Sequence, residues 1–212
     1  DFKIKQFLKA AKTDIRYYHQ IWLGSLDYAE SLELLSSPAH AVEEVFSPHI
    51  AAYRKDLSLL NNASESYVKT YLTDDILVKT DRASMAYSLE VRAPLLDKEL
   101  ASYVMRLPAE YKMNGLTVKY ILKKLLRNRV PQEIVKRPKK GFGIPVAKWF
   151  KGPLREEMME TLSVENIRKT DVFNPATVQM YINEHLNNAK DNRKILWTLY
   201  IFQKWALANK DL

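Results

Sequence analysis

A short basic segment has the residue types needed to hold a phosphate. Four of the five residues in the run Lys-Arg-Pro-Lys-Lys at 136–140 are cationic, and Gly141 and Gly143 follow closely. Glycine frees the backbone to approach a ligand, and lysine is a compact charge on a flexible stem. The segment is therefore a candidate loop that closes over a phosphate. A solvated basic loop and a nuclear-localisation match are the alternative interpretations.

A second charged segment, Thr73–Leu89, has the pattern of a helix with acids at its start. Thr73 predicts an N-cap, and Asp74 and Asp75 would lie in the first turn, where the helix dipole favours acidic side chains. Asp75 and Lys79 have the i,i+4 spacing of an ordinary helical ion pair. All of these features have a structural explanation that needs no ligand.

The same segment lacks a wide polar face when it is projected on a helix. Arg82 falls on the side of Asp75 and Lys79, whereas Asp74 and Asp81 fall within an apolar stripe. A helix that is apolar nearly all round is usually buried, so its charges should be paired or line a cleft. Apolar residues surround the axis: Ile76, Leu77, Val78, Ala83, Met85, Ala86 and Leu89.

The exit from this helix carries another pair of opposite charges. Glu90 and Arg92 precede Pro94, and we expect them to form an ion pair that fixes the exit. Structural ion networks of this kind resemble functional sites in sequence, so both interpretations stay open.

Several classes of chemistry are excluded by the residue types. There is no cysteine, which excludes disulfides, zinc-thiolate sites and a cysteine nucleophile. The 4 histidines show no metal-ligand spacing, so we predict no metal site, and a Gly-x-Ser-x-Gly elbow is absent. No apolar run is long enough for a membrane span, and no signal segment opens the chain. A cytoplasmic location is compatible with these features.

The elements that position these residues are predicted to be helices. Apolar residues recur every three or four positions along 22–35, 116–126 and 195–206, and strict alternation is rare, so we expect few strands. A soft boundary is expected near 48–64, where Asn-Asn-Ala-Ser at 61–64 interrupts the pattern. Aromatic residues at helical spacing are expected in the core: Trp149, Trp197, Tyr200, Phe202 and Trp205.

The net charge of +8 in 212 residues has two interpretations. It predicts either a nucleic-acid surface or a face that handles a nucleotide triphosphate or pyrophosphate. The basic stretch has no recognisable nucleic-acid module and the aromatics do not form stacking platforms, which favours the second. Much of the excess lies at Lys112, Lys119, Lys123, Lys124, Arg127, Arg129, Lys136, Arg137, Lys139, Lys140, Lys148 and Lys151.

Five motifs, in order between residues 71 and 143, make the stretch 71–205 resemble the C-terminal half of the synthetase domain of glutamine-hydrolysing asparagine synthetases. They read Tyr-Leu-x-Asp-Asp-Ile-Leu-x-Lys at 71–79, Asp-Arg-Ala-Ser-Met-Ala at 81–86 and Leu-Glu-Val-Arg-x-Pro-Leu-Leu-Asp at 89–97. Lys-Tyr-x-Leu at 119–122 and Arg-Pro-Lys-Lys-Gly-Phe-Gly at 137–143 complete the set. The family's Ser-Gly-Gly-x-Asp-Ser phosphate loop is absent, because no two of the 5 glycines are adjacent.

The resemblance implies a fold as well as a family. We expect a predominantly α-helical chain, the C-terminal helical half of an adenine-nucleotide α-hydrolase (pyrophosphate-loop ATPase) α/β domain whose sheet-bearing half is missing. Residues 1–64 would form a variable helical layer and residues 65–212 the family-matching part, or the two would form one continuous domain.

The function implied by the resemblance is an ATP-dependent ligase. It would convert aspartate to asparagine through β-aspartyl-AMP, with Mg-ATP as cosubstrate and ammonia supplied by a glutaminase domain. The catalytic lysine falls on Lys139, with Lys140 as the fallback, and an acidic partner falls on Asp75, with Asp74 second. Weaker candidates for phosphate or carboxylate contacts are Lys79, Arg82 and Arg92.

The implied partners are the missing N-terminal half of the synthetase domain and the glutaminase domain, and a homodimer is compatible. The fragment alone is expected to be inactive. Within the same class, a related amidotransferase or a cyclase acting on another carboxylate is the alternative. From a different class, the alternative is a basic helical module that binds nucleic acid or protein.

Overall fold

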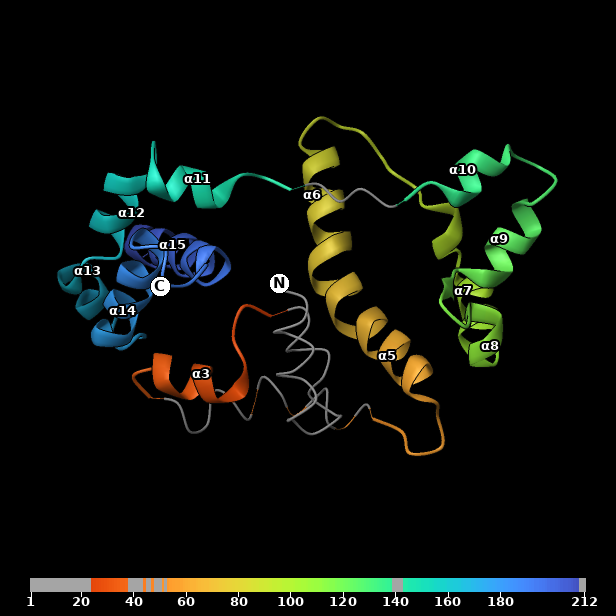
Figure 1. Ribbon diagram of the computed structural model, residues 1–212, viewed down its shortest axis with the longest axis horizontal. Coiled ribbons are helices and arrows are strands. Elements are labelled where there is room, and N and C mark those ends of the chain that lie inside the picture. Colours follow the sequence, from red (N-terminus) through yellow and green to blue (C-terminus); the bar gives the residue numbers. More distant parts are fainter. Residues whose placement is uncertain are drawn as a thin grey trace. The chain divides into compact units, whose positions relative to one another are not determined.

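A computed structural model describes residues 24–37, 44, 47, 51, 53–138 and 143–209 (Figure 1). Its contacts divide the chain into two compact units. One, the terminal unit, comprises Asp1–Pro48 and Phe142–Leu212, and the other, the central unit, comprises His49–Gly141. The described residues are predominantly helical, as predicted, with a single two-stranded sheet among them. No helix in these ranges is both long enough and apolar enough to cross a membrane.

The terminal unit is a helical bundle built around its last helix, α15 (Arg193–Ala208). Four helices contact α15: α11 (Val146–Lys151), α12 (Arg155–Thr161), α13 (Val164–Thr170) and α14 (Pro175–Leu186). Figure 1 shows these helices gathered around α15. The core lies between them and contains fully buried apolar side chains such as Phe150, Met158, Leu162, Ile167 and Leu196.

Local sequence signals set the ends of these helices. Asn174 caps α14, because its Oδ1 accepts from the Ala176 backbone N–H at 2.9 Å, and Pro175 occupies the first helical position. Helix α3 (Tyr28–Leu34) begins with a capping box in which Asp27 and Glu30 satisfy each other's backbone N–H groups. Its end joins the bundle through a β-bridge between Leu35 and Phe173.

The predicted aromatic core is confirmed in part. Phe150 and Tyr200 are buried with ring centroids 5.6 Å apart, and Trp149, Trp197 and Phe202 pack against the core. Trp205 was expected in the core, but it is 57% exposed, so this prediction is wrong. It lies on α15 in contact with Phe202 on one side and leaves its other side to solvent.

The central unit contains one long helix followed by short elements. The helix runs through α5 (Leu59–Tyr67), the π-helix η2 (Val68–Leu77) and α6 (Val78–Met85). Next come the 3₁₀ turn η3 (Pro94–Leu96), α7 (Lys98–Arg106) and α8 (Ala109–Lys112). The antiparallel strands β1 (Met113–Asn114) and β2 (Thr117–Val118) then lead to α9 (Tyr120–Leu126) and α10 (Gln132–Lys136).

Two of the expected helical stretches are shorter in the structure. The stretch at 116–126 begins with β2, and its helix starts after Lys119, which adopts a left-handed backbone conformation at φ 57°. The stretch at 22–35 becomes helical at Tyr28, and Trp22 lies outside the described residues. The interruption predicted at 61–64 is not found, because these residues lie inside α5.

Polar contacts, rather than an apolar core, hold the described part of the central unit. None of its apolar side chains is buried, whereas Asn62 is 5% exposed. The Asn62 amide accepts from the Arg54 backbone N–H at 2.9 Å and donates to the Arg54 and Leu57 carbonyls. Lys112 donates from α8 to the Asn61 side chain at 2.8 Å, and burial lowers the pKa of its ammonium. These contacts fix the α5 end of the long helix.

Candidate functional site

The long helix of the central unit carries most of the predicted site residues. It begins at the N-cap Ser58, whose Oγ accepts from the Asn61 backbone N–H at 3.2 Å. The backbone stays helical through Val68 (φ −65°, ψ −47°) and Leu77 (φ −70°, ψ −44°), so α5, η2 and α6 form one continuous helix. Figure 1 shows this as a single rod between the labels α5 and α6.

The continuous helix corrects the predicted helix start. Thr73 is not an N-cap, because it lies inside η2 and its Oγ1 donates to the Val68 carbonyl at 2.7 Å. Asp74 and Asp75 therefore lie in mid-helix, away from the positive end of the helix dipole. Dipole complementation does not explain these two acids. The sequence suggested a start at Thr73 because threonine next to acids is a common capping pattern, and Ser58 was the real cap.

The π-helical stretch itself coincides with the predicted acidic residues. Val68–Leu77 includes Asp74 and Asp75, and π-helical turns are rare and frequently lie at functional sites. Thr70 and Thr80 bond to backbone carbonyls four residues earlier, whereas Thr73 reaches back five residues. The widened turn changes which side chains share a face, so the regular helical projection does not hold across Asp74 and Asp75.

The charges on this helix face solvent in the described structure. Asp75 and Lys79 form the predicted ion pair, with Oδ1 and Nζ 3.4 Å apart. Arg82 makes no ion pair with any described residue. The prediction that the helix is buried is wrong for this part of the chain, because every residue of η2 and α6 is at least partly exposed. Leu77, Val78 and Met85 are 40%, 38% and 52% exposed.

A groove runs beside the C-terminal half of the helix. It lies between α6 and the segment 91–98 and has a volume of about 780 Å³. Arg92 lines it, and its guanidinium is held by Glu90, with the Arg92 Nε and the Glu90 carboxylate 2.7 Å apart. The predicted Glu90–Arg92 pair is thereby confirmed. The lining residues are Leu77, Val78, Thr80, Asp81, Val91, Arg92, Ala93, Pro94, Leu96, Asp97 and Lys98.

Three charged residues of the groove were not among the predicted site residues. Asp97 has a structural task, because its Oδ1 accepts from the Leu100 backbone N–H at 2.9 Å and caps α7. Asp81 and Lys98 have no such bond and present opposite charges to the groove. The helical projection placed Asp81 in one stripe with Val78. That stripe indicated where Asp81 lies, since both residues line the groove.

The predicted site residues are thus only partly brought together. Arg92 lines the groove, and Asp75 contacts Lys79, whereas Asp74, Asp75, Lys79 and Arg82 do not line it. Lys139 and Lys140 lie outside the described residues. The described part of the site offers cations and carboxylates on one exposed helix and its exit. It contains no nucleophile paired with a base.

The described donor set does not fit a metal site. No group of three or more histidine, aspartate or glutamate side chains in these ranges is placed to hold an ion. The acids of the long helix and groove are either paired with lysine, engaged in a cap or separated from one another. Magnesium, which the family resemblance implies with ATP, therefore has no ligand set among these residues.

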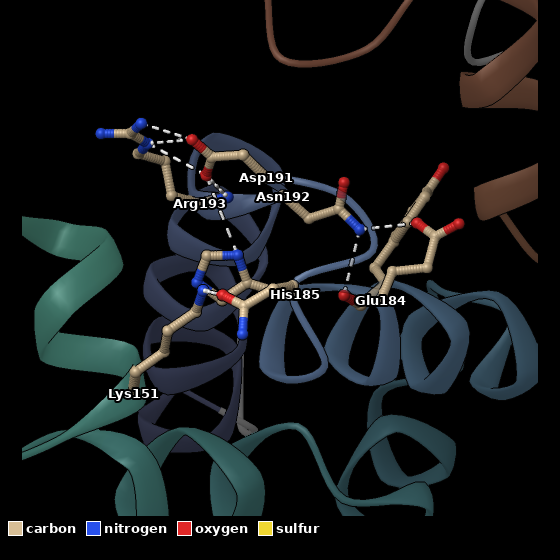
Figure 2. Close-up of polar contacts among 8 residues, drawn as sticks. Lys151, Glu184, His185, Asp191, Asn192 and Arg193 are labelled. Atoms are coloured by element: carbon tan, nitrogen blue, oxygen red, sulfur yellow. Dashed lines mark hydrogen bonds and ion pairs between the residues drawn. The ribbon is translucent and has the colours of Figure 1, made fainter.

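A buried polar cluster in the terminal unit contains His185 (Figure 2). Its side chain is fully buried at the end of α14, and neither ring nitrogen has a hydrogen-bond partner among the described residues. Asp191 Oδ1 lies 3.8 Å from Nδ1, but Asp191 is engaged by Arg193, whose Nε donates to its carboxylate at 2.8 Å. Lys151 approaches from α11 and donates to Asn188 at 2.6 Å.

The electrostatics of the cluster keep His185 neutral. Burial, and then the nearby Lys151 charge, lower the pKa of the imidazole below its ordinary value. Asp191 and the Ala147 carbonyl oppose this shift, although neither makes a hydrogen bond of normal geometry to the ring. Asn192 closes the turn beside it by donating to Glu184 at 2.8 Å and to the Tyr181 carbonyl. The cluster joins α14 to α15 and has no nucleophile to activate.

Sequence comparison decides the family. The asparagine synthase family model matches residues 8–207, which is nearly the whole chain. The chain belongs to the asparagine synthase family. A Mycobacterium tuberculosis protein assigned as a glutamine-hydrolysing asparagine synthetase is 39% identical over 137 residues, covering 64% of this chain and 21% of that protein. The family resemblance drawn from the motifs is confirmed.

Other relatives agree with this placement in the asparagine synthase family. Asparagine synthetase 1 of Bacillus subtilis is 32% identical over 143 residues, which cover 67% of this chain and 22% of that protein. The Mesocricetus auratus asparagine synthetase is 38% identical over 157 residues, covering 68% and 28%. The matches thus span between about a fifth and about a quarter of the relatives' length. No solved structure matches the chain.

Proposed function

We propose that this chain is the C-terminal part of a glutamine-dependent ligase that converts aspartate to asparagine. The observation that carries the proposal is the family match over residues 8–207, within which all five motifs fall in order. The chemistry has two steps. An aspartate carboxylate oxygen bonds to the α-phosphorus of ATP and pyrophosphate leaves, giving β-aspartyl-AMP. Ammonia derived from glutamine then attacks the acyl carbon, and AMP leaves.

In this proposal the basic loop stabilises the leaving group. Negative charge develops on the α-phosphate oxygens and the departing pyrophosphate, where a fixed cation lowers the barrier. We assign that role to Lys139, with Lys140 as the fallback, and give Asp75 the acidic role on the long helix. Arg92 is the candidate for a contact to a carboxylate or phosphate of the substrates, because it lines the groove next to α6. Asp74, Lys79 and Arg82 stay secondary candidates, and no step is assigned to magnesium.

The apolar surface that the central unit exposes supports the proposal that another domain covers it. Large apolar side chains along the long helix and its exit are open to solvent, including Met85 at 52%, Leu89 at 60% and Val91 at 53%. Exposed apolar surface of this extent marks a contact region. We propose that the N-terminal half of the synthetase domain, with its phosphate loop and sheet, covers this surface in an adenine-nucleotide α-hydrolase fold. A glutaminase domain would supply ammonia, and the parent protein would act in the cytoplasm.

The carboxylate substrate is the least constrained part of the proposal. Residues that recognise the acid would come in part from the missing half, so a related amidotransferase or cyclase stays the second candidate. The different class considered from sequence, a nucleic-acid-binding or protein-binding module, is disfavoured by the family match. The substrate and the role of Lys139 are therefore tested together.

The first prediction concerns pyrophosphate release by the intact parent protein. With Mg-ATP, ammonium and aspartate, we expect release that requires aspartate and falls by two orders of magnitude or more, about 10²–10³-fold, in Lys139→Ala. The matched control is Lys169→Ala, a lysine in an exposed ion pair with Glu165 on α13. Circular dichroism of both variants checks that folding is retained.

The other outcomes separate the parts of this proposal. Full activity in Lys139→Ala with loss in Lys140→Ala would move the role to Lys140 and keep the ligase. Release that requires a different acid would replace aspartate but keep the family chemistry. A folded parent that binds ATP yet releases no pyrophosphate with any carboxylate would contradict the proposed function.

A further inference from the structure

The ends of α9 and α10 form a basic pocket that the proposed ligase chemistry does not use. The pocket has a volume of about 450 Å³ and lies within the central unit, where α10 follows α9 around a short turn (Figure 1). The lining residues are Thr117, Tyr120, Lys123, Lys124, Arg127, Gln132, Val135 and Lys136. We refer to it as the α9–α10 pocket.

The pocket has a strong and uncompensated positive charge. Its lining includes four cations and no acid. None of the four makes an ion pair or side-chain hydrogen bond with a described residue. The acid nearest in sequence, Glu133, lies in the first turn of α10 and does not line the pocket. Placing four like charges around one cavity is unfavourable unless an anion compensates them.

The turn between the two helices is fixed by its own hydrogen bonds. Gln132 Nε2 donates to the Arg127 carbonyl at 2.5 Å, which ties the first residue of α10 to the end of α9. The Val130 backbone N–H bonds to the Leu126 carbonyl at 3.2 Å, and that of Ile134 to the Pro131 carbonyl at 3.0 Å. The backbone that holds Arg127 and Lys136 on the two sides of the cavity is thus defined without a ligand.

A structural explanation covers some of these residues but not their arrangement. Lys123 and Lys124 lie in the last turn of α9 and Lys136 in the last turn of α10, where cations complement the helix dipole. Dipole complementation also covers Arg127, the C-cap of α9, but it does not require residues from both helices to face the same cavity. Nor does it explain the lack of any acid among the lining residues.

The remaining lining groups suit a ligand with several phosphate oxygens. An arginine guanidinium offers parallel N–H donors that match phosphate geometry, and lysines add point charges. Thr117 offers a hydroxyl donor, and Tyr120 adds a half-buried ring and a hydroxyl. Four positive charges balance a diphosphate or triphosphate better than a single phosphate. The size of the cavity also suits a small molecule rather than a duplex.

We propose that the α9–α10 pocket is a binding site for an oligophosphate, either inorganic pyrophosphate or the phosphate chain of a nucleotide. The proposal rests on the described lining residues alone and goes beyond the proposed ligase function, which gives these four cations no role. The two sources share the diphosphate group, which the cations recognise. Which of them binds more tightly depends on whether Tyr120 contributes a contact to a base.

The test uses this chain and isothermal titration calorimetry at fixed ionic strength. Pyrophosphate and ADP are titrated in parallel, with orthophosphate as the weak comparison. We expect measurable pyrophosphate binding that weakens about tenfold or more in Arg127→Gln, the loss expected for one hydrogen bond to a charged group. Arg106→Gln, an arginine at the end of α7 that does not line the pocket, is the matched control and should bind like the original chain.

Further variants keep the interpretation unambiguous. Lys136→Gln should also weaken binding, whereas Lys169→Ala, a lysine on α13 that does not line the pocket, should leave it unchanged. Equal pyrophosphate affinity in Arg127→Gln, Lys136→Gln and the control would overturn the proposal. Tight binding of single-stranded RNA with no detectable binding of pyrophosphate would overturn it as well, in favour of a nucleic-acid surface. Circular dichroism confirms folding of each variant.

Discussion

At the scale of single residues, buried His185 couples the stability of the terminal unit to pH. Its imidazole is held neutral in the folded chain, because burial and Lys151 lower its pKa below the ordinary value of 6.5. In the unfolded chain the ring takes up a proton as the pH falls through that value. Protonation therefore favours the unfolded state. The stabilisation from neutral His185 is present above pH 6.5 and is lost as the pH falls toward the folded-state pKa.

This residue gives a prediction for denaturant unfolding. The urea midpoint of the chain should fall between pH 7.5 and pH 5.5, and the fall should be smaller in His185→Gln, which cannot take up the proton. Asp191 and Arg193 face the same turn but keep their charges throughout this range, so they do not imitate the effect. His185→Asn is the second variant, in case glutamine does not fit the site. Equal pH dependence in the original chain and both variants would contradict the assignment.

Two ion pairs show that a contact predicted from sequence spacing can form without either side chain being buried. Asp75 with Lys79 and Glu90 with Arg92 form the ion pairs that their spacing predicts, and both pairs are exposed. Exposed pairs of this kind contribute little to stability, typically about 0–1 kcal/mol. Their presence is therefore better explained by local geometry or by a ligand than by a need for stability.

At the scale of elements, α15 shows which aromatic residues stabilise the bundle. Phe150 on α11 is fully buried and lies 5.8 Å from Trp197 and 5.6 Å from Tyr200, measured between ring centroids. Trp205 lies later on the same helix and is 57% exposed. The helix thus has one face in the core and one face in solvent, as expected for an amphipathic helix.

A pair of substitutions tests this division. Phe150→Ala should lower the free energy of unfolding by about 3–5 kcal/mol, because it leaves a cavity in the core. Trp205→Ala should lower it by less than about 1 kcal/mol, as most exposed substitutions do. Chemical denaturation monitored by circular dichroism gives both values. Equal costs for the two variants would show that the core is assigned wrongly.

The long helix of the central unit is the element that sequence patterns described least well. The pattern at Thr73 predicted a helix start, but Ser58 caps the helix and the π-helical stretch carries it past Asp74 and Asp75. The threonine hydroxyls of this stretch bond to backbone carbonyls of preceding turns, so they do not act as caps. A capping residue and a mid-helix threonine look alike in sequence, since both use the same short hydroxyl.

At the scale of the whole molecule, the two units differ in how they are stabilised. The buried apolar side chains of the described residues all belong to the terminal unit. The central unit is held by polar contacts at Asn62 and Lys112, and it exposes large apolar side chains. A unit without buried apolar residues gains little from the hydrophobic effect. We infer that the central unit depends on a partner surface for much of its stability.

This difference predicts the behaviour of the chain in solution. The isolated chain should bind an apolar dye strongly or self-associate with concentration, as measured by dye fluorescence and light scattering. Leu89→Lys, on the exposed side of the helix exit, should reduce both signals. Met159→Lys, at an apolar site on α12 that is 45% exposed, is the control and should have less effect. A monomer that binds no dye would contradict the inferred partner surface.

The sequence by itself determined the helical class, the family and the contacts between close neighbours in the chain. Asp75 with Lys79, and Glu90 with Arg92, pair over four and two positions, so they depend on the local backbone and not on how distant elements pack. The family follows from five motifs in order, since their combination does not depend on knowing which surfaces are buried. The domain division at residue 64, the identity of the catalytic lysine and the substrate stay predictions.

Only the tertiary structure decided which side chains are buried and which side chains from different elements meet. It placed Trp205 in solvent and His185 in the core, although both have apolar neighbours at helical spacing. It brought Lys136 to the same cavity as Lys123, and Asp81 to the same groove as Arg92. These outcomes depend on how elements pack across turns and on which faces receive a partner. Periodicity describes one helix at a time and does not contain that information.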